Sequence, residues 1–219
     1  MESQDAYQEG MFMAEASQGD VSATVVSNAQ HALNLLQKEV ANCTSCPLGS
    51  SRTQVVFGTG NVGSPLIFIG EGPGQKEDEQ GEPFVGRSGQ LLNRLIYEEL
   101  NVERGMVYIA NIVKCRPPGN RNPTPAEIAA CTPFLKRQLD QLNYKLIVAL
   151  GSVAARYFIG DTCKITKEHG LVYETQFGMV IPMYHPSYLL RTGGLNVSSM
   201  RADLVGAKMY LKNIGQWPW

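Results

Sequence analysis

Four of the five cysteines of this chain have a spacing that suits a metal centre. Cys43 and Cys46 are separated by two residues, Cys115 follows after 68 more, and Cys131 after a further 15. A redox CxxC pair works alone, and a zinc ribbon usually combines two tight pairs. One tight pair with two dispersed thiolates is more typical of an iron–sulfur cluster. Pro47 directly follows Cys46, as a proline follows the last cysteine of ferredoxin-like runs. The pattern favours a four-cysteine iron–sulfur cluster, with structural zinc as the alternative and disulfides less expected.

A glycine-rich loop that carries an acid directly follows an apolar strand signal. Gly70, Gly72 and Gly74 permit close approach of the backbone to a ligand and leave main-chain N–H groups free for anions. Glu71 lies within this loop, and a run of three acids begins at Glu77. The segment is therefore a candidate ligand loop, and a solvated surface loop is the alternative.

The following segment, EPFVGRSG, places an aromatic residue, an arginine and the start of a helix within eight residues. Phe84 lies between a proline and glycines, where an aromatic ring can serve as a stacking platform or join the core. Arg87 with the helix start at Ser88 could hold a phosphate group. An ordinary surface role is the alternative for both.

Two further polar residues stand where strands are expected to end. Asn111 is flanked by apolar residues, so its amide must either tie down a loop or read the donor–acceptor edge of a ligand. His185 precedes a proline in a turn that leaves a strand, which favours a constrained imidazole pointing outward. Each is a candidate site residue.

The segment 58–63 matches the GxGxxG dinucleotide fingerprint literally. That fingerprint requires a helix directly after the glycines, whereas here Ser64, Pro65 and a strand follow. We therefore interpret the segment as a glycine-rich hairpin turn.

Strand and helix signals alternate along the chain, which indicates an α/β sandwich with a mostly parallel central sheet. Thr124, Pro125 and Glu127 give one helix a clear start, with an N-cap, a proline at the first position and a capping-box partner. In such sheets ligands bind beyond the carboxyl ends of the strands. The expected strands cover 66–69, 107–113, 146–150 and 179–183, and the expected helices cover 28–41, segments beginning near 88, 124 and 152, and 199–214.

Composition is that of an ordinary globular protein. The chain has 219 residues, 43% of them hydrophobic, and a formal net charge of −1, so there is no global basic field and any nucleic-acid binding must use a local patch. We expect residues 1–27 to be a disordered leader and residues 28–219 to form one domain. No signal peptide or membrane-length apolar run is evident, so we expect a cytoplasmic protein.

Five segments together resemble the family-4 uracil-DNA glycosylases, an iron–sulfur branch of that superfamily. They read CTSCPL, GEGPGQKEDEQGEPFVGRSGQLL, NIVKCRPPGNRNPTPAEIAAC, ALG and HPSYLLR, in the expected order over about 36–213. The resemblance implies a three-layer sandwich with a four-stranded sheet and a [4Fe–4S] cluster on the four cysteines named above. It also implies a monofunctional enzyme that hydrolyses the N-glycosidic bond of uracil in DNA, the first step of base excision repair.

The resemblance also implies residue roles. Phe84 would stack on the flipped base, Asn111 would read its edge, and His185 would donate to uracil O2. Glu71 would orient or activate the water. In other branches an aspartate that positions the water follows this glutamate, whereas this chain has Gly72.

The same resemblance places the substrate loop and the DNA contacts. We expect Glu77 and the three loop glycines to lie at the substrate, and Glu77 or Asp78 to replace Glu71 if it is not the catalytic carboxylate. The expected partner is single- or double-stranded DNA containing uracil, bound by a monomer. The alternative is a non-catalytic iron–sulfur protein that binds nucleic acid or carries electrons. The expected DNA contacts are Arg87, Ser88, Ser187, Leu189, Leu190 and Arg191.

Overall fold

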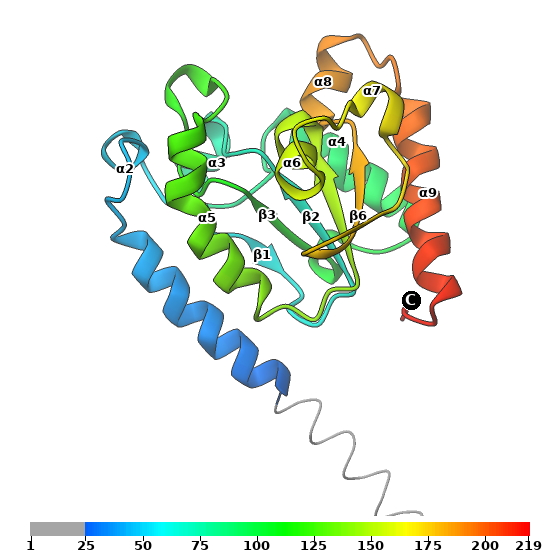
Figure 1. Ribbon diagram of the computed structural model, residues 1–219, viewed down its shortest axis with the longest axis horizontal. Coiled ribbons are helices and arrows are strands. Elements are labelled where there is room, and N and C mark those ends of the chain that lie inside the picture. Colours follow the sequence, from blue (N-terminus) through cyan, green and yellow to red (C-terminus); the bar gives the residue numbers. More distant parts are fainter. Residues whose placement is uncertain (1–24) are drawn as a thin grey trace, which may run out of the picture.

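The computed structural model describes residues 25–219 as a sheet enclosed by helices (Figure 1). A long helix covers 25–41, so the helix expected at 28–41 is present and begins earlier than expected. The predicted leader lies outside the described residues except for 25–27, which belong to this helix.

The remaining elements alternate between strand and helix for most of the chain. The strands are β1 (Thr59–Gly60), β2 (Leu66–Gly70), β3 (Tyr108–Asn111), β4 (Leu146–Leu150), β5 (Tyr173–Thr175) and β6 (Gly178–Met183). The α-helices are α2 (Leu48–Ser51), α3 (Gln75–Gln80), α4 (Arg87–Leu95), α5 (Pro125–Leu139), α6 (Gly151–Ile159), α7 (Ile165–Glu168), α8 (Pro186–Arg191) and α9 (Val197–Asn213). A π-helical turn, η1 (Ile96–Leu100), and two 3₁₀ turns, η2 (Arg104–Met106) and η3 (Pro118–Asn120), lie between them.

The strands form one six-stranded sheet in the order β1-β3-β2-β4-β6-β5. The four central strands run parallel, which confirms the α/β class and the parallel sheet expected from the sequence. The expectation of four strands omitted β1 and β5, which pair antiparallel at the two edges. These edge strands span only two and three residues, too few for an alternating pattern to show in the sequence.

The segment 58–63 is not the hairpin turn that we expected. Its β1 residues pair with β3, and they do not pair with the β2 strand that follows. A Cβ atom at Gly60 would lie 1.9 Å from the carbonyl oxygen of Val107, and the φ of Gly60 is +126°. Glycine is therefore required here for close strand pairing. The literal match to a dinucleotide fingerprint arises from this packing requirement.

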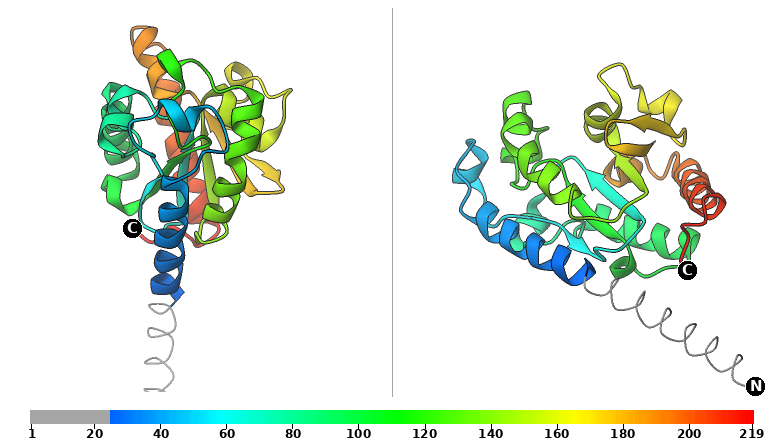
Figure 2. Two further views of the ribbon diagram at one scale, coloured as in Figure 1. Left: turned by 90° about the vertical axis from the view of Figure 1, so that its left-hand side faces the viewer. Right: turned by 60° about the horizontal axis from the view of Figure 1, so that its bottom comes forward.

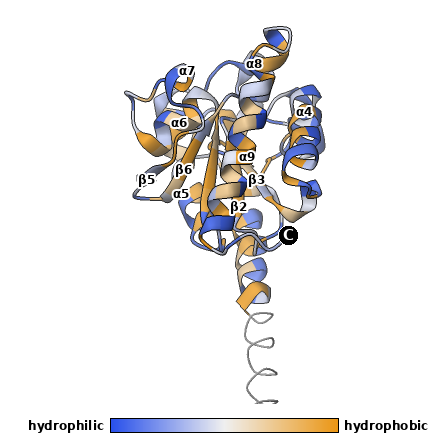
Figure 3. Ribbon diagram, turned by 90° about the vertical axis from the view of Figure 1, so that its right-hand side faces the viewer, coloured by the Kyte–Doolittle hydropathy of each residue, from blue (hydrophilic) through white to orange (hydrophobic). Residues whose placement is uncertain are grey.

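The central strands bury both faces, because alternate side chains enter two separate cores. Leu66 and Phe68 of β2 pack with α4, α8 and α9 on one face, whereas Ile67 and Ile69 pack with the first helix, α5 and α6 on the other. Figure 2 shows the helices on either side of the sheet, and Figure 3 shows the hydrophobic strands between them. Two-sided burial explains why these strands appear as continuous apolar runs.

The four parallel strands all end at the same edge of the sheet. Their last residues are Gly70, Asn111, Leu150 and Met183, and α8 and the loop before α5 rise at this end of the molecule (Figure 1). The start of α5 is confirmed, since Thr124 and Glu127 form the complete capping box. Among residues 25–219, no helix is long and apolar enough to cross a membrane.

Candidate active site

A cleft of about 610 Å³ lies at the carboxyl ends of the parallel strands, where the sequence predicted a ligand site. It is lined by the loop after β2, by the end of β3, by the start of α6 and by the turn between β6 and α8. The expected site residues in its wall are Glu71, Gly72, Gly74, Glu77, Phe84, Ser88, Asn111, His185, Ser187 and Arg191. The structure thus brings together most of the residues that the sequence singled out.

Asn111 presents an unpaired acceptor in this cleft. Its side chain is 1% exposed, and within the described part of the chain its buried Oδ1 has no hydrogen-bond partner. A buried unpaired acceptor costs about 1–3 kcal/mol, so the site is incomplete until a ligand supplies a donor. The main chain of Asn111 is fixed separately, because its carbonyl accepts from Nζ of Lys114 at 2.9 Å.

Phe84 lies against Asn111 and is held in an unusual backbone conformation. Its φ is +54°, which a bulky residue adopts only when its surroundings hold it there, at a cost of about 1–3 kcal/mol. A Cβ atom at Gly70 would lie 2.7 Å from Cζ of the Phe84 ring and 2.5 Å from Asn111 Oδ1. Gly70 therefore allows the ring and the amide to converge at the end of β2. The ring is buried in the core and also faces the cleft.

His185 is a neutral donor by its geometry. Its Nδ1 accepts from the backbone N–H of Ser187 at 3.1 Å and lies 2.8 Å from Ser187 Oγ, so the ring proton resides on Nε2. Burial, and then the charge of Arg191, lowers the pKa of His185 to about 4. Its ring lies 5.6 Å from the Phe84 ring, measured between centroids, and it packs on Gly151, where a Cβ atom would come within 3.0 Å.

The three candidate acids, Glu71, Glu77 and Asp78, have different surroundings. Burial raises the pKa of Glu71 to about 6, with Arg191 opposing the shift, and no hydrogen-bond partner of its carboxylate is found among the described residues. Glu77 Oε1 instead accepts from the backbone N–H groups of Val85 and Gly86, at 3.0 and 2.8 Å. Glu71 is thus the acid available for chemistry at neutral pH.

Asp78, the second alternative to Glu71, does not line the cleft. It is 3% exposed, and its Oδ1 accepts from the backbone N–H groups of Thr53 and Gln54, at 2.9 and 3.4 Å. The aspartate that the resemblance implies in other branches would require Val113 to shift here, since a Cβ atom at Gly72 would lie 2.7 Å from Cγ2 of Val113. Neither position supplies a second free carboxylate.

The expected DNA contacts divide into three groups. Ser88, Ser187 and Arg191 line the cleft, and Arg191 Nη1 donates to Ser187 Oγ at 3.2 Å. Arg87 and Leu190 are exposed outside the cleft. Leu189 is fully buried in the core beneath α8, so in this conformation it cannot be the side chain that enters a duplex.

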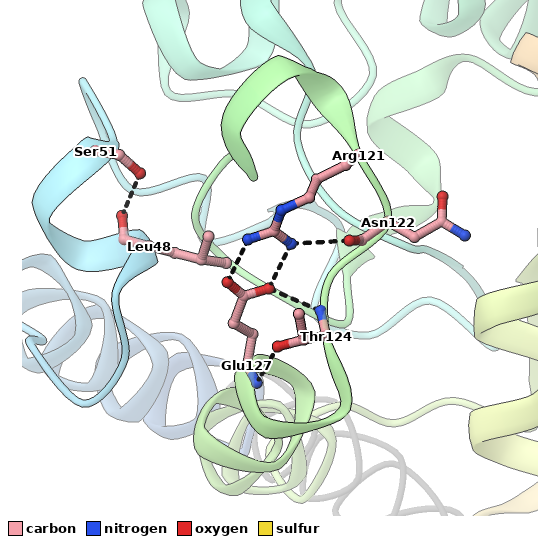
Figure 4. Close-up of polar contacts among 6 residues, drawn as sticks. All are labelled: Leu48, Ser51, Arg121, Asn122, Thr124 and Glu127. Atoms are coloured by element: carbon pink, nitrogen blue, oxygen red, sulfur yellow. Dashed lines mark hydrogen bonds and ion pairs between the residues drawn. The ribbon is translucent and has the colours of Figure 1, made fainter.

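One wall of the cleft consists of residues that the sequence analysis did not single out. Asn120 and Arg121 line it from the loop between Cys115 and Cys131. Arg121 donates from two nitrogens to the two carboxylate oxygens of Glu127, at 2.7 and 2.8 Å, as Figure 4 shows. Glu127 also accepts from the N–H of Thr124, so this wall is fastened to the start of α5. The run RPPGNRN, rich in arginine and asparagine, is the sequence signal that could have indicated this wall of the cleft.

The four predicted cluster cysteines line one small recess beside the first helix. N–H donors reach three of the sulfurs: Arg52 Nη1 to Cys115 at 3.4 Å, the N–H of Lys114 to Cys131 at 3.3 Å, and the N–H of Ser45 to Cys43 at 3.5 Å. These donors and the cationic Arg52 and Lys114 suit a centre bound by thiolates. Among residues 25–219, however, no three potential ligands lie close enough together to hold a single metal ion. The four cysteines thus share one recess without being grouped around a single ion site.

The fold and this geometry can be compared with known proteins. Residues 57–205 match the family model described as the uracil DNA glycosylase superfamily. A type-4 uracil-DNA glycosylase from Thermotoga maritima is 45% identical over 186 residues, which cover 84% of this chain and 96% of that protein. The type-4 uracil-DNA glycosylase of Archaeoglobus fulgidus is 39% identical over 72% of this chain and 83% of its own. A type-5 uracil-DNA glycosylase from Pyrobaculum aerophilum is 39% identical over 45% of each chain.

The Arg121–Glu127 pair should make the stability of the fold depend on pH. The hydrogen bonds from Arg121, with that from Thr124, hold the pKa of Glu127 at about 2, below its ordinary 4.5. Ionised Glu127 therefore stabilises the fold above pH 4.5, and this stabilisation is lost as the pH falls toward 2. Glu127→Gln should lower the free energy of urea unfolding by about 1–2 kcal/mol at neutral pH and by less near pH 3.

The matched control is Glu39→Gln, which removes the bidentate partner of Arg137 from a pair whose side chains are half exposed. Exposed ion pairs contribute little to stability, so its effect should be small at both pH values. Equal losses in the two variants would contradict the role given to Glu127.

Proposed function

This chain belongs to the type-4 uracil-DNA glycosylases of the uracil DNA glycosylase superfamily, and from that premise we propose how its cleft recognises and releases uracil. It hydrolyses the N-glycosidic bond of uracil in DNA and leaves an abasic site, which begins base excision repair. The observation that carries the proposal is the orphaned acceptor of Asn111 beside the ring of Phe84. Uracil brings the N3–H donor that this acceptor lacks, together with a flat face for the ring.

Asn111 gives the cleft a preference for uracil over cytosine. Its Oδ1 accepts from uracil N3–H, and its amide N–H₂ donates to O4. Cytosine carries an acceptor at N3 and a donor at N4, so both contacts would be mismatched in a buried site. Sites that leave buried polar groups unpaired reject the wrong ligand by about 10⁴-fold or more.

Phe84 compensates part of the cost of taking the base out of the stack. Flipping costs a few kcal/mol, and stacking on an aromatic side chain contributes about 1–3 kcal/mol per base. Because the Phe84 ring is already buried and fixed, the base meets a prepared surface. Binding therefore needs little rearrangement of the protein.

His185 stabilises the charge that appears as the bond breaks. Uracil departs as an anion, and the Nε2–H of His185 is the donor that can reach its O2. With a pKa of about 4 the imidazole stays neutral at physiological pH, so it donates a hydrogen bond and does not transfer a proton. A donor aimed at a developing oxyanion acts mainly in the transition state, which raises the rate.

Glu71 serves the other side of the reaction. The sugar becomes cationic as uracil departs, and an ionised carboxylate stabilises it and takes a proton from the attacking water. The raised pKa, about 6, lets Glu71 be both ionised and basic at neutral pH. Among the described residues no lysine lines the cleft, and the scheme therefore includes no lyase step.

The four cysteines would hold a [4Fe–4S] cluster, and no step of the excision needs it. When bound, the cluster would tie the chain after the first helix to the end of β3 and to α5. Lys114 lies between this recess and the cleft, fully buried, with Nζ donating to the Asn111 carbonyl and, at 2.6 Å, to Oε1 of Gln138. The cluster would thus support the strand end that carries Asn111.

The DNA partner would approach the rim of the cleft. Arg191 and Arg121 line the mouth, with Ser88 and Ser187, and Arg87 is exposed at the start of α4. Contacts from these cations to phosphates would make binding fall with increasing salt. Leu190, at 39% exposed, is the apolar side chain of α8 available to fill the space left by the base.

The function is tested by incubating the protein with a single-stranded oligonucleotide that contains one uracil and then cleaving abasic sites with alkali. We expect strand cleavage with the wild type and a loss of about 10²–10³-fold in rate for Asn111→Asp, since one donor is replaced by an acceptor. An oligonucleotide with cytosine in place of uracil is the control. Intact strands with both single- and double-stranded uracil substrates would disprove the enzyme function, and an unchanged Asn111→Asp rate would disprove edge reading.

The role of Glu71 predicts an acidic limb in the pH profile. The carboxylate must be ionised to act, so kcat/KM should fall about tenfold per pH unit below a pKa of about 6. Glu71→Gln should lower the rate at neutral pH by about 10²–10⁴-fold and remove this limb. His185 stays neutral over the same range and adds no second limb. An acidic limb that persists in Glu71→Gln would assign the titration to another group.

The cluster proposal is tested by iron and acid-labile sulfide analysis of the purified protein. We expect about four of each per chain, and loss of both in Cys131→Ser. Cys163→Ser is the control, since Cys163 is a buried cysteine that lies outside the recess. Stoichiometric zinc in place of iron would contradict the proposal.

A further inference from the structure

The conformation of Phe84 depends on groups that lie outside the cleft. Its positive φ belongs to a turn between α3 and α4 that has no strand or helix hydrogen bonding of its own. A phenylalanine in a flexible turn would relax to a negative φ and take its ring away from the end of β2. Something must therefore hold the turn.

Arg104 holds it from one side. Nη1 of Arg104 donates to the carbonyl of Phe84 at 3.0 Å and to Oδ1 of Asn93 at 2.8 Å, and Nη2 donates to the carbonyl of Pro83. The guanidinium thus fastens two successive carbonyls of the turn to the body of α4. Its planar fork of donors makes this possible, and a lysine could not reproduce it.

These contacts distinguish Arg104 from the ion-pairing arginines. Among the described residues, Arg104 forms no salt bridge, whereas Arg201 pairs with two glutamates and Arg94 with one. Burial lowers the pKa of Arg104, with Glu82 and Glu77 opposing that shift. A half-buried cation whose partners are neutral carbonyls and an amide is there for the geometry it imposes.

The other side of the turn is equally confined. The carboxylate of Glu77 binds the backbone N–H groups of Val85 and Gly86, the two residues after Phe84. A Cβ atom at Gly89 would lie 1.9 Å from the Phe84 carbonyl oxygen, so the first turn of α4 leaves that oxygen no space to move away from Arg104. The carbonyl is caught between α4 and the guanidinium.

The geometry points to Arg104 as a positioning residue for base stacking, one that fixes the backbone of Phe84 so that its ring faces the flipped base. This inference rests on the proposed function and deepens it, since it assigns the orientation of the stacking surface to a residue outside the cleft. Arg104 touches neither base nor DNA in this scheme. Its effect must therefore pass through Phe84.

A double-mutant cycle tests this dependence. kcat and KM for the single-stranded uracil oligonucleotide are measured for the wild type, Arg104→Met, Phe84→Leu and the double variant. We expect Phe84→Leu to lower kcat/KM about 10–100-fold and Arg104→Met about tenfold. In the Phe84→Leu background, Arg104→Met should cost no more than about twofold, because the ring it positions is gone.

Equal losses from Arg104→Met in the two backgrounds would overturn the inference, as would no loss in the wild-type background. A general loss of folded protein would appear equally in both backgrounds and counts against it. Arg94→Met is the matched control, an exposed arginine whose pair with Glu98 lies at 4.0 Å, and it should leave kcat/KM unchanged. Where Arg104→Met does not fold, Arg104→Lys takes its place in the same cycle.

A second measurement does not depend on activity and so separates this inference from the proposed function. The ring of Phe84 lies close enough to His185 for its ring current to shift the imidazole C–H proton resonances. Arg104→Met should move these resonances, whereas Arg94→Met should not. Unchanged His185 resonances in Arg104→Met would overturn the inference even in an active enzyme. The expected shift in Arg104→Met, together with a wild type that releases no uracil, would disprove only the function.

Discussion

The arrangement of the cleft depends on one close approach at the end of β2. Because Gly70 has no Cβ, the ring of Phe84 and the amide of Asn111 can meet over it, where any side chain would come within 2.5 Å of Asn111 Oδ1. That approach brings together the ring proposed to stack on the base and the acceptor proposed to read its edge. The parallel pairing of β2 with β3 places Gly70 and Asn111 directly beside each other.

The acids near the cleft have different tasks because they have different neighbours. Glu77, Asp78 and Glu127 are buried, and each accepts hydrogen bonds from the backbone. Glu127 also binds Arg121. Their charge is used to hold loops. Glu71 gains burial without such partners, and its pKa rises accordingly. Hydrogen bonding, and not proximity to the cleft, distinguishes the carboxylate left for chemistry from those that shape the site.

The recess of the four cysteines and the cleft are two ends of one buried polar network. Lys114 joins them, since its backbone N–H donates to Cys131 Sγ and its Nζ donates to the carbonyl of Asn111. Gln138 continues the network from α5 to Phe57 and Tyr108. The four cysteines, which we propose hold a cluster, are thereby linked to the strand end that we propose recognises the base.

The sequence alone was enough to predict the parallel core strands, the capped start of α5, the four cysteines and the residues at the strand ends, because apolar runs, caps and rare side chains leave local signals. It could not give the edge strands, whose two or three residues carry no periodicity. Nor could it show that Leu189 is buried, that Glu77 binds backbone or that Arg104 holds Phe84. Those facts depend on contacts between segments that lie apart in the chain, such as α4 and α8 around Leu189, and on the positive φ of Phe84, which only the folded chain imposes.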